Sequence, residues 1–314
     1  MRRTPSCLAI FFALAVSLAA CRPAASPQPG TPANPNAPAD AGISSNIRIT
    51  GEISDTDPKL EGRIQIKGVG DFTFDPGQVR TVRKDVFREG HFSLFDILVY
   101  LGKTGQIKLQ YHFDATMDTN VIDSVNGEKT WWYTACYDGG SPEPNTWRMD
   151  LYPYKDKTQC IVAQEDQAAI QARYGVFRDE VSRKEKAGGK VVIPEVVVQG
   201  KSKTMTFRDV EVKPHNVRND CFQDGVVTAA DVILTLADRK EISCELRWYE
   251  SIGAAGIVKT YYVDRINEDA THDRTGFIYE MGSTKDRKGN LLHIPADTRV
   301  LTCPEYMRWS YRSL

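Results

Sequence analysis

A repeat inside the chain constrains its fold more than any other feature of the sequence. Residues 82–98, VRKDVFREGHFSLFDIL, align without a gap with residues 217–233, VRNDCFQDGVVTAADVI. Shorter matches extend the alignment on both sides, pairing residues 64–68 with 196–200, 108–111 with 245–248, 122–126 with 263–267, and 131–133 with 277–279. Because matching segments in a fixed order indicate a duplicated unit, the chain is predicted to contain two copies of one domain.

Each copy has the same predicted order of elements. A segment of alternating apolar residues that ends in a Gly turn is typical of a β-hairpin. A capping box then begins a short helix, Ser93-x-x-Asp96 in the first copy and Thr228-x-x-Asp231 in the second. Strands rich in aromatic residues follow. This order predicts an α+β fold with two tandem β-grasp-like domains, each with one short helix packed on a sheet.

A helix is expected between the two copies. Ile170, Tyr174, Phe177 and Val181 are spaced by 4, 3 and 4 residues, which places them on one apolar face. This face is expected to pack on one or both domains; an amphipathic helix that binds a partner is the alternative. The predicted boundaries are a first domain at 47–163, a bridging helix at 164–189 and a second, degenerate copy at 190–314.

The first residues predict export and a lipid anchor. Residues 1–20 combine a basic start with an apolar run that is too short to span a bilayer, and they end before Cys21 in a lipobox-like LAAC. Cys21 is therefore the expected lipidation site, and an ordinary secretory signal with a chance cysteine is the alternative. The Pro/Ala-rich residues 21–46 predict a disordered tether. We expect a cell-envelope protein held to the membrane by lipid, in the outer rather than the inner membrane of a Gram-negative cell, since Arg22 is not the retention residue Asp.

The net charge and the sequence motifs limit the functions that the chain is expected to have. With 40 basic and 41 acidic residues the chain has no excess of positive charge, so no nucleic-acid partner is expected. The five His residues are scattered, and no P-loop, dinucleotide fingerprint, G-x-S-x-G or H-E-x-x-H motif is present. We therefore predict no catalytic residues, no cofactor and no bound metal.

The first copy resembles a known family. Its order S-L-F-D-I-L, a strand, V-N-G and W-W-Y before a Gly-containing turn is similar to that of the transcobalamin-like C-terminal domain family of bacteria. The matching residues are Ser93, Asp96, Asn126, Gly127, Trp131, Trp132, Tyr133, Asp138 and Gly139. The second copy departs from the pattern, with Glu268 in place of the Gly and Phe277-Ile278 in place of the Trp pair. The resemblance implies a β-grasp-like fold in a secreted or surface setting, and tandem copies imply interaction or ligand binding.

One segment looks like a calcium loop. Asp220, Asp224, Gly225 and Asp231 fall at positions 1, 5, 6 and 12 of an EF-hand spacing. Phe222 occupies the third ligand position, where it offers no oxygen, and the other copy also has Phe there. The segment is therefore interpreted as a turn followed by a helix cap, not as a metal site.

Five cysteines would remain after signal removal and lipidation. Export permits disulfides. The alignment sets Cys221 and Cys244 opposite a pair of apolar residues in the first copy, which makes Cys221–Cys244 the preferred disulfide. Cys136–Cys160 is a second expected pair, and Cys303 is left over as a free thiol or an unassigned partner.

The ligand site is expected beside the aromatic strand. Trp132, Tyr137 and Asp138 lie next to the Gly/Pro-rich loop 138–145, where binding function is often found. The three residues are the candidates for a stacking surface, although a core role for the aromatic rings is the alternative. The sequence thus predicts an envelope ligand-binding or scaffold module with an unknown ligand or protein partner. A hydrolase with a site between the two copies is the alternative, and corrinoid binding is a weaker one.

Overall fold

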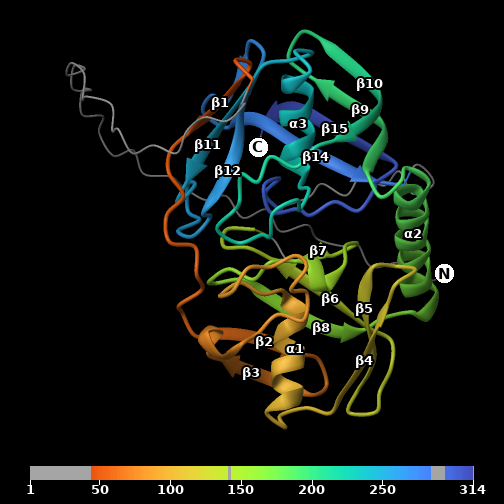
Figure 1. Ribbon diagram of the computed structural model, residues 1–314. Coiled ribbons are helices and arrows are strands. Elements are labelled where there is room, and N and C mark those ends of the chain that lie inside the picture. The colour runs from red at the N-terminus through yellow and green to blue at the C-terminus, as the bar shows by residue number, and fades with distance from the viewer. Residues whose placement is uncertain (1–43, 141–142, 284–293, 314) are drawn as a thin grey trace, which may run out of the picture. The chain divides into compact units, whose positions relative to one another are not determined.

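The computed structural model describes residues 44–140, 143–283 and 294–313 (Figure 1). The described residues belong to one compact unit, Gly42–Leu314. The expected signal peptide, Cys21 and most of the tether lie outside the described residues. The helices are α1 (Leu94–Lys103), α2 (Gln167–Lys186) and α3 (Ala229–Asp238), with short 3-10 turns η1 (Pro76–Gln78) and η2 (Met149–Leu151).

The strands fall into two runs, one on each side of α2. Before α2 come β1 (Ile47–Thr50), β2 (Gly62–Ile66), β3 (Gly70–Phe74), β4 (Leu109–Asp114), β5 (Thr119–Val125), β6 (Trp131–Cys136), β7 (Glu143–Pro144) and β8 (Gln159–Gln164). After α2 come β9 (Val191–Gln199), β10 (Thr204–Val212), β11 (Cys244–Tyr249), β12 (Thr260–Ile266), β13 (Asp269–Ala270), β14 (Thr275–Gly282) and β15 (Tyr306–Ser313). The predicted α+β class is confirmed.

Two mixed sheets have the same strand order. One runs β3-β2-β8-β6-β7 and the other β10-β9-β15-β14. In both, the first strand of a hairpin pairs in parallel with the last strand, with Ile66 opposite Val162 and Val198 opposite Trp309. Helix α1 packs into the first hydrophobic core and α3 into the second. We call residues 62–164 the N-terminal half, and residues 191–313 together with β1 the C-terminal half.

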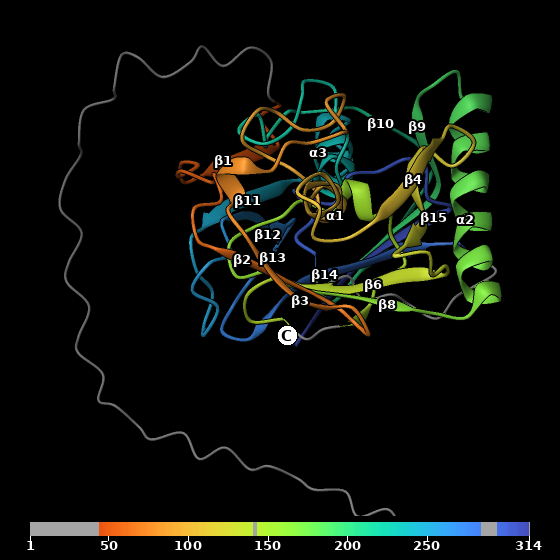
Figure 2. The same cartoon turned by 90° about the horizontal axis from the view of Figure 1, so that it is seen from below.

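Strand β1 lies in the half opposite to the one expected. It was predicted to open the first domain at residue 47, but it pairs in parallel with β11, placing Ile47 opposite Cys244. Ile47 and Ile49 pack on the second core for that reason. The resulting sheet runs β1-β11-β12-β13, whereas its counterpart contains only β4 and β5 (Figures 1 and 2).

The helix starts follow the prediction in both halves. Ser93 and Asp96 form a complete capping box at α1, and Thr228 and Asp231 form one at α3. Each carboxylate accepts from the backbone N–H of the capping residue, which satisfies a donor that the helix itself cannot pair. Both carboxylates are fully buried, so these caps are part of the cores and not of the surface.

Other contacts also recur. Asn126 exchanges hydrogen bonds with Lys108 in one half, and Asn267 does the same with Ser243 in the other. A β-bulge follows at the same place in each strand pair. Lys108 therefore corresponds to Ser243, which corrects the sequence alignment of 108–111 with 245–248 by two residues.

Helix α2 fills the position predicted for the bridge. Ile170 and Phe177 are buried on its apolar face. Glu180 accepts a charged hydrogen bond from the buried Arg148 of the N-terminal half. Arg183 donates to the backbone oxygen of Cys303 in the C-terminal half at 3.0 Å, so α2 contacts both halves.

Candidate functional site

The predicted aromatic surface is part of the core. Trp132 is 8% exposed, because α2 covers it with the rings of Tyr174 and Phe177. Tyr137 is also buried and donates its hydroxyl to the backbone oxygen of Pro153 at 2.8 Å. The proposal that these residues form a stacking surface is therefore wrong, and the core alternative holds for both rings.

Asp138, the third candidate, is a structural residue. Its carboxylate accepts hydrogen bonds from the backbone N–H groups of Gly256 and Ile257, at 2.8 and 3.0 Å. Lys157 lies 3.6 Å from the same oxygen. Asp138 thus joins a loop of the N-terminal half to a loop of the C-terminal half. Its carboxylate is occupied by these contacts within the protein.

Both predicted disulfides are absent, and the five described cysteines are free and buried. Cys221 lies in the first core, whereas Cys244 lies in the second core, so the two thiols are in different cores. In the β6–β8 pair, Cys160 is opposite Ala135 and Cys136 is opposite Gln159. Neighbouring residues of a strand point to opposite faces, so the two thiols cannot meet.

The residues of the calcium-like segment have other partners. Asp220 accepts two hydrogen bonds from Arg218, and Asp224 pairs with Arg88. Asp231 caps α3. Within the described ranges, no three or more His, Cys, Asp or Glu side chains form a group that could hold a metal ion.

A symmetric contact joins the two halves at the repeated segment. Phe87 and Phe222, which occupy the same place in the repeat, form a β-bridge with their ring centroids 5.6 Å apart. Arg88 N–H donates to the oxygen of Cys221, and Gln223 N–H donates to that of Val86, at 3.0 and 2.9 Å. This reciprocal pattern is that of an isologous contact, so the halves meet about a local pseudo-twofold axis at the Phe pair.

A cavity lies on each side of this axis, and the two are lined by corresponding residues. One is an open cleft of about 450 Å³, which we call the open cleft. The other has about 20 Å³, which we call the closed cavity. Their corresponding lining residues, open cleft first, are Arg83 and Arg218, Val86 and Cys221, Val226 and His91, Val300 and Pro153, Leu301 and Tyr154, and Thr302 and Lys155.

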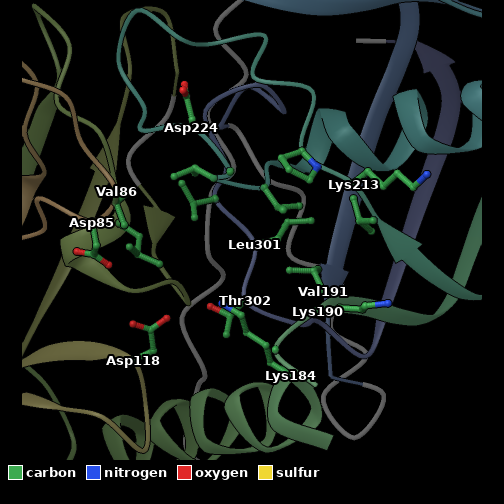
Figure 3. A pocket seen from close by; sticks show the side chains of 18 of the residues that line it. Asp85, Val86, Asp118, Lys184, Lys190, Val191, Lys213, Asp224, Leu301 and Thr302 are labelled. Carbon is green, nitrogen blue, oxygen red and sulfur yellow. The ribbon is translucent and has the colours of Figure 1, made fainter. Parts of the chain in front are cut away.

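Charged residues line both walls of the open cleft. Figure 3 shows Asp85 and Asp118 on one wall and Lys190 and Lys213 on the opposite wall. Both aspartates pair with the buried Arg83, at 2.8 and 2.9 Å. Burial alone would raise the pKa of Asp85, but its hydrogen bonds with Arg83 outweigh burial and lower it. Arg83 also pairs with the buried Asp150 at 3.2 Å, so one guanidinium serves three carboxylates and the acidic wall keeps negative charge.

The basic wall is only partly neutralised. Lys190 pairs with Glu211 at 3.0 Å. Lys184, at the end of α2, and Lys213 also line the open cleft; neither makes an ion pair within 4 Å of a described carboxylate, although the charge of Lys184 contributes to lowering the pKa of Asp85. Between the walls, the apolar side chains of Val226 and Leu301 line the cleft. The open cleft thus combines an apolar surface with charges of both signs, and an acidic group of a ligand would be favoured only beside Lys184 and Lys213.

The closed cavity contains a polar network. Thr56 Oγ1 lies 3.1 Å from His91 Nε2 and donates to Asp220 at 2.6 Å. Burial opposes the ionised form of Asp220, but its hydrogen bonds with Arg218 prevail and lower its pKa to about 2. Burial lowers the pKa of Lys155 to about 8, although its ammonium donates to the oxygens of Val258 and Lys259.

The difference between the two cavities comes from the segment that follows β1. Residues 51–61 leave the C-terminal half and cross the closed cavity to reach β2, and Thr56 lines the cavity from this segment. The carboxylate of Asp156 fixes the segment by accepting from the N–H groups of Lys59 and Leu60, and Lys259 donates to the oxygen of Asp55. The open cleft is bordered instead by the end of α2 and residues 189–191.

No match is found between this chain and the family models, curated proteins or solved structures with which it was compared. In the described part of the chain, no helix has the length and apolar character needed to cross a membrane. Lys184 and Lys213 were not predicted as site residues. The position of Phe87 and Phe222 in the repeat was the signal that could have directed attention to the surfaces between the copies.

Proposed function

We propose that the chain is a lipid-anchored cell-envelope protein with two tandem β-grasp-like domains, which binds a ligand or partner in the open cleft between them. The observation that carries this proposal is the pair of unequal cavities about one pseudo-twofold axis. One is covered by the chain itself, whereas the other is open and has two unpaired cations at its wall. Cys21 remains the proposed anchor.

The β-grasp-like assignment is supported by the shared strand order and by recurring contacts outside the aligned core segment. Tyr133 and Tyr279 each donate a hydroxyl to a backbone oxygen of the segment that follows, that of Trp147 and that of Ile294. A buried Arg–Asp ion pair also recurs, once in each half. These features support a duplicated domain and agree with the transcobalamin-like resemblance, which remains part of the proposal.

Binding is favoured over catalysis by the size of the two cavities. Lys155, whose pKa burial lowers to about 8, lies at the closed cavity, whose 20 Å³ is close to the volume of one water molecule. The open cleft could hold a ligand of several hundred Å³, in the usual range for binding sites. A hydrolase would need a group in the open cleft whose pKa is shifted toward neutrality, whereas the pKa of Asp85 there is lowered by its hydrogen bonds with Arg83.

A thermal-shift screen tests the proposal. The full chain is screened against envelope glycans, peptides and corrinoids, together with a Val226→Trp variant that fills the open cleft. We expect at least one ligand to raise the melting temperature of the wild type but not of Val226→Trp. Lys129→Trp, an exposed position outside the cleft, is the matched control and should respond like the wild type. Equal shifts in all three proteins would contradict binding in the cleft.

A further inference from the structure

The edge of β4 is bare in the N-terminal half. Strand β4 pairs with β5 and with no other strand of the described residues. Four consecutive side chains of β4, residues 110–113, are exposed, and among them Tyr111 and Phe113 expose 38% and 51% of their surface. An unpaired strand edge with exposed aromatic residues is a template for another strand.

The C-terminal half shows what covers this edge. There β1 adds to β11, the counterpart of β4. The residues corresponding to Tyr111 and Phe113 are Leu246 and Trp248, which are only 0% and 9% exposed. The correspondence is independent of the sequence alignment, because Arg83 stacks over Phe113 at 5.6 Å and Arg218 stacks over Trp248 at 5.3 Å.

The backbone at Gly51, directly after β1, lies against Trp248. Gly51 has φ of +82°, and a Cβ at this position would lie 2.8 Å from Trp248 Cβ. Gly51 therefore lets the backbone leave β1 against the ring. From there, residues 51–61 continue over the closed cavity. Strand addition and cavity coverage are thus performed by one continuous extended segment.

The free edge of β4 has a backbone N–H group that could pair with an added strand, as β11 pairs with β1. In β11, Cys244 N–H donates to the oxygen of Asn46 at 2.9 Å, away from β12. In β4, Lys108 exchanges its hydrogen bonds with Asn126 on the side of β5, so by the alternation of the ladder the next N–H, that of Leu109, faces the free edge. The donor that holds β1 in one half therefore faces outward in the other.

The corresponding segment of the chain does not fill this edge. The residues that lead into β9 form α2, which packs on Trp132, and α2 is not a strand that pairs with β4. The open cleft lies next to the free edge of β4, and Lys184 and Lys213 line this cleft. Arg83, which stacks on Phe113, also lines the cleft, so edge and cleft adjoin.

We propose that an extended segment of a partner protein adds to β4 as a parallel strand and continues into the open cleft, with alternating apolar residues on β4 and acidic residues beside Lys184 and Lys213. This is β-strand addition, in which backbone hydrogen bonds give affinity and side-chain pockets give selectivity. The inference rests on the proposed binding role of the open cleft and specifies its ligand.

The chain's own residues 46–58, NIRITGEISDTDP, have the required pattern and provide the probe. A fluorescein-labelled peptide of this sequence is titrated with the full chain, and binding is followed by anisotropy. We expect saturable binding that Phe113→Thr weakens about tenfold, since Thr keeps strand propensity but removes the ring. Ile252→Thr, which removes an exposed apolar side chain elsewhere, is the matched control and should leave the affinity unchanged.

Two further measurements separate strand addition from other modes of binding. In a parallel ladder with the same register as that of β1, the N–H of Arg48 faces the acceptor strand and that of Ile49 faces away. N-methylation at Arg48 should therefore abolish binding, and at Ile49 it should not. Lys184→Gln and Lys213→Gln should each weaken binding a few-fold at low salt, with the difference decreasing as salt rises.

Several results would overturn the proposal. Equal affinity for the wild type and Phe113→Thr would place the peptide elsewhere, for example on β11 in place of β1. Concentration-dependent dimers of the chain alone that Phe113→Thr disrupts would assign the edge to β1 of a second copy. If the peptide does not bind while small ligands still stabilise the wild type and not Val226→Trp, strand addition is wrong and the cleft's binding role stands; if neither binds, both are wrong.

Discussion

The contact between Phe87 and Phe222 is predicted to make the two halves unfold together. Both rings are buried, and the backbone hydrogen bonds on either side of them cross from one half to the other. Replacing either Phe with Leu removes three carbons, which at about 0.8 kcal/mol for each carbon group amounts to about 2 kcal/mol. The aromatic pair contributes a further ~1 kcal/mol that either substitution removes, so each single variant should lose about 3 kcal/mol, and the double variant about 5 kcal/mol and not the additive ~6 kcal/mol.

The assay is urea unfolding followed by tryptophan fluorescence and by far-UV circular dichroism. Trp147 reports on the N-terminal half and Trp309 on the C-terminal half, so coincident curves indicate one transition. With a slope of about 2 kcal/mol per molar urea, each single variant should lower the midpoint by about 1.5 M.

Phe92→Leu is the matched control for this cycle. Phe92 stacks on Tyr154 inside the N-terminal half and does not contact Phe222. Its combination with Phe222→Leu should be additive. Two separate transitions, or an additive Phe87→Leu/Phe222→Leu double variant, would refute the coupling of the halves through this contact.

Further predictions concern buried charges and thiols. Burial disfavours the charged form of His215, but its hydrogen bonds with Asp231 and Asp238 prevail and raise its pKa above 6.5. The resulting stabilisation is complete below pH 6.5 and is lost as the pH rises through the raised value, so urea midpoints of the wild type and His215→Gln should converge at alkaline pH. Asp297→Asn should cost about 2 kcal/mol, because the buried Arg218 loses its 2.9 Å ion pair but keeps the one with Asp220; urea unfolding measures the loss, and a change below about 1 kcal/mol would contradict it. Finally, the five described cysteines should resist alkylation in the native protein and all react in denaturant without reductant, as peptide mass mapping would show. Pairs that stay unmodified would restore the disulfide prediction.

Local signals in the sequence were reliable. The repeat located α1 and α3, and the capping boxes at Ser93 and Thr228 were recognisable because a cap depends on residues within one helical turn. The α+β class followed from the same local order. These features need no knowledge of what packs against them.

The site could not be predicted by such reasoning. Trp132 looks like a surface residue until α2 covers it, and the pairing of β1 with β11 joins residues that are far apart in the sequence. The cysteine pairing failed because Cys221 packs in the first core although it belongs to the second copy of the repeat, and no local signal shows such an exchange between the halves. The open cleft is formed by segments from both halves, so none of its residues stands out in a linear motif.

The position of β1 also determines how a pulling force would enter the protein. A load applied through the residues before Ile47 reaches β11 of the C-terminal half first, and it acts along a parallel ladder of four residue pairs. Parallel hydrogen bonds loaded along the strand direction share the force among all pairs instead of opening one after another. If Cys21 is lipid-anchored, the C-terminal half is thus the mechanical base of the molecule. Detachment of β1 would then draw residues 51–61 away from Asp156 and open the closed cavity before either core unfolds.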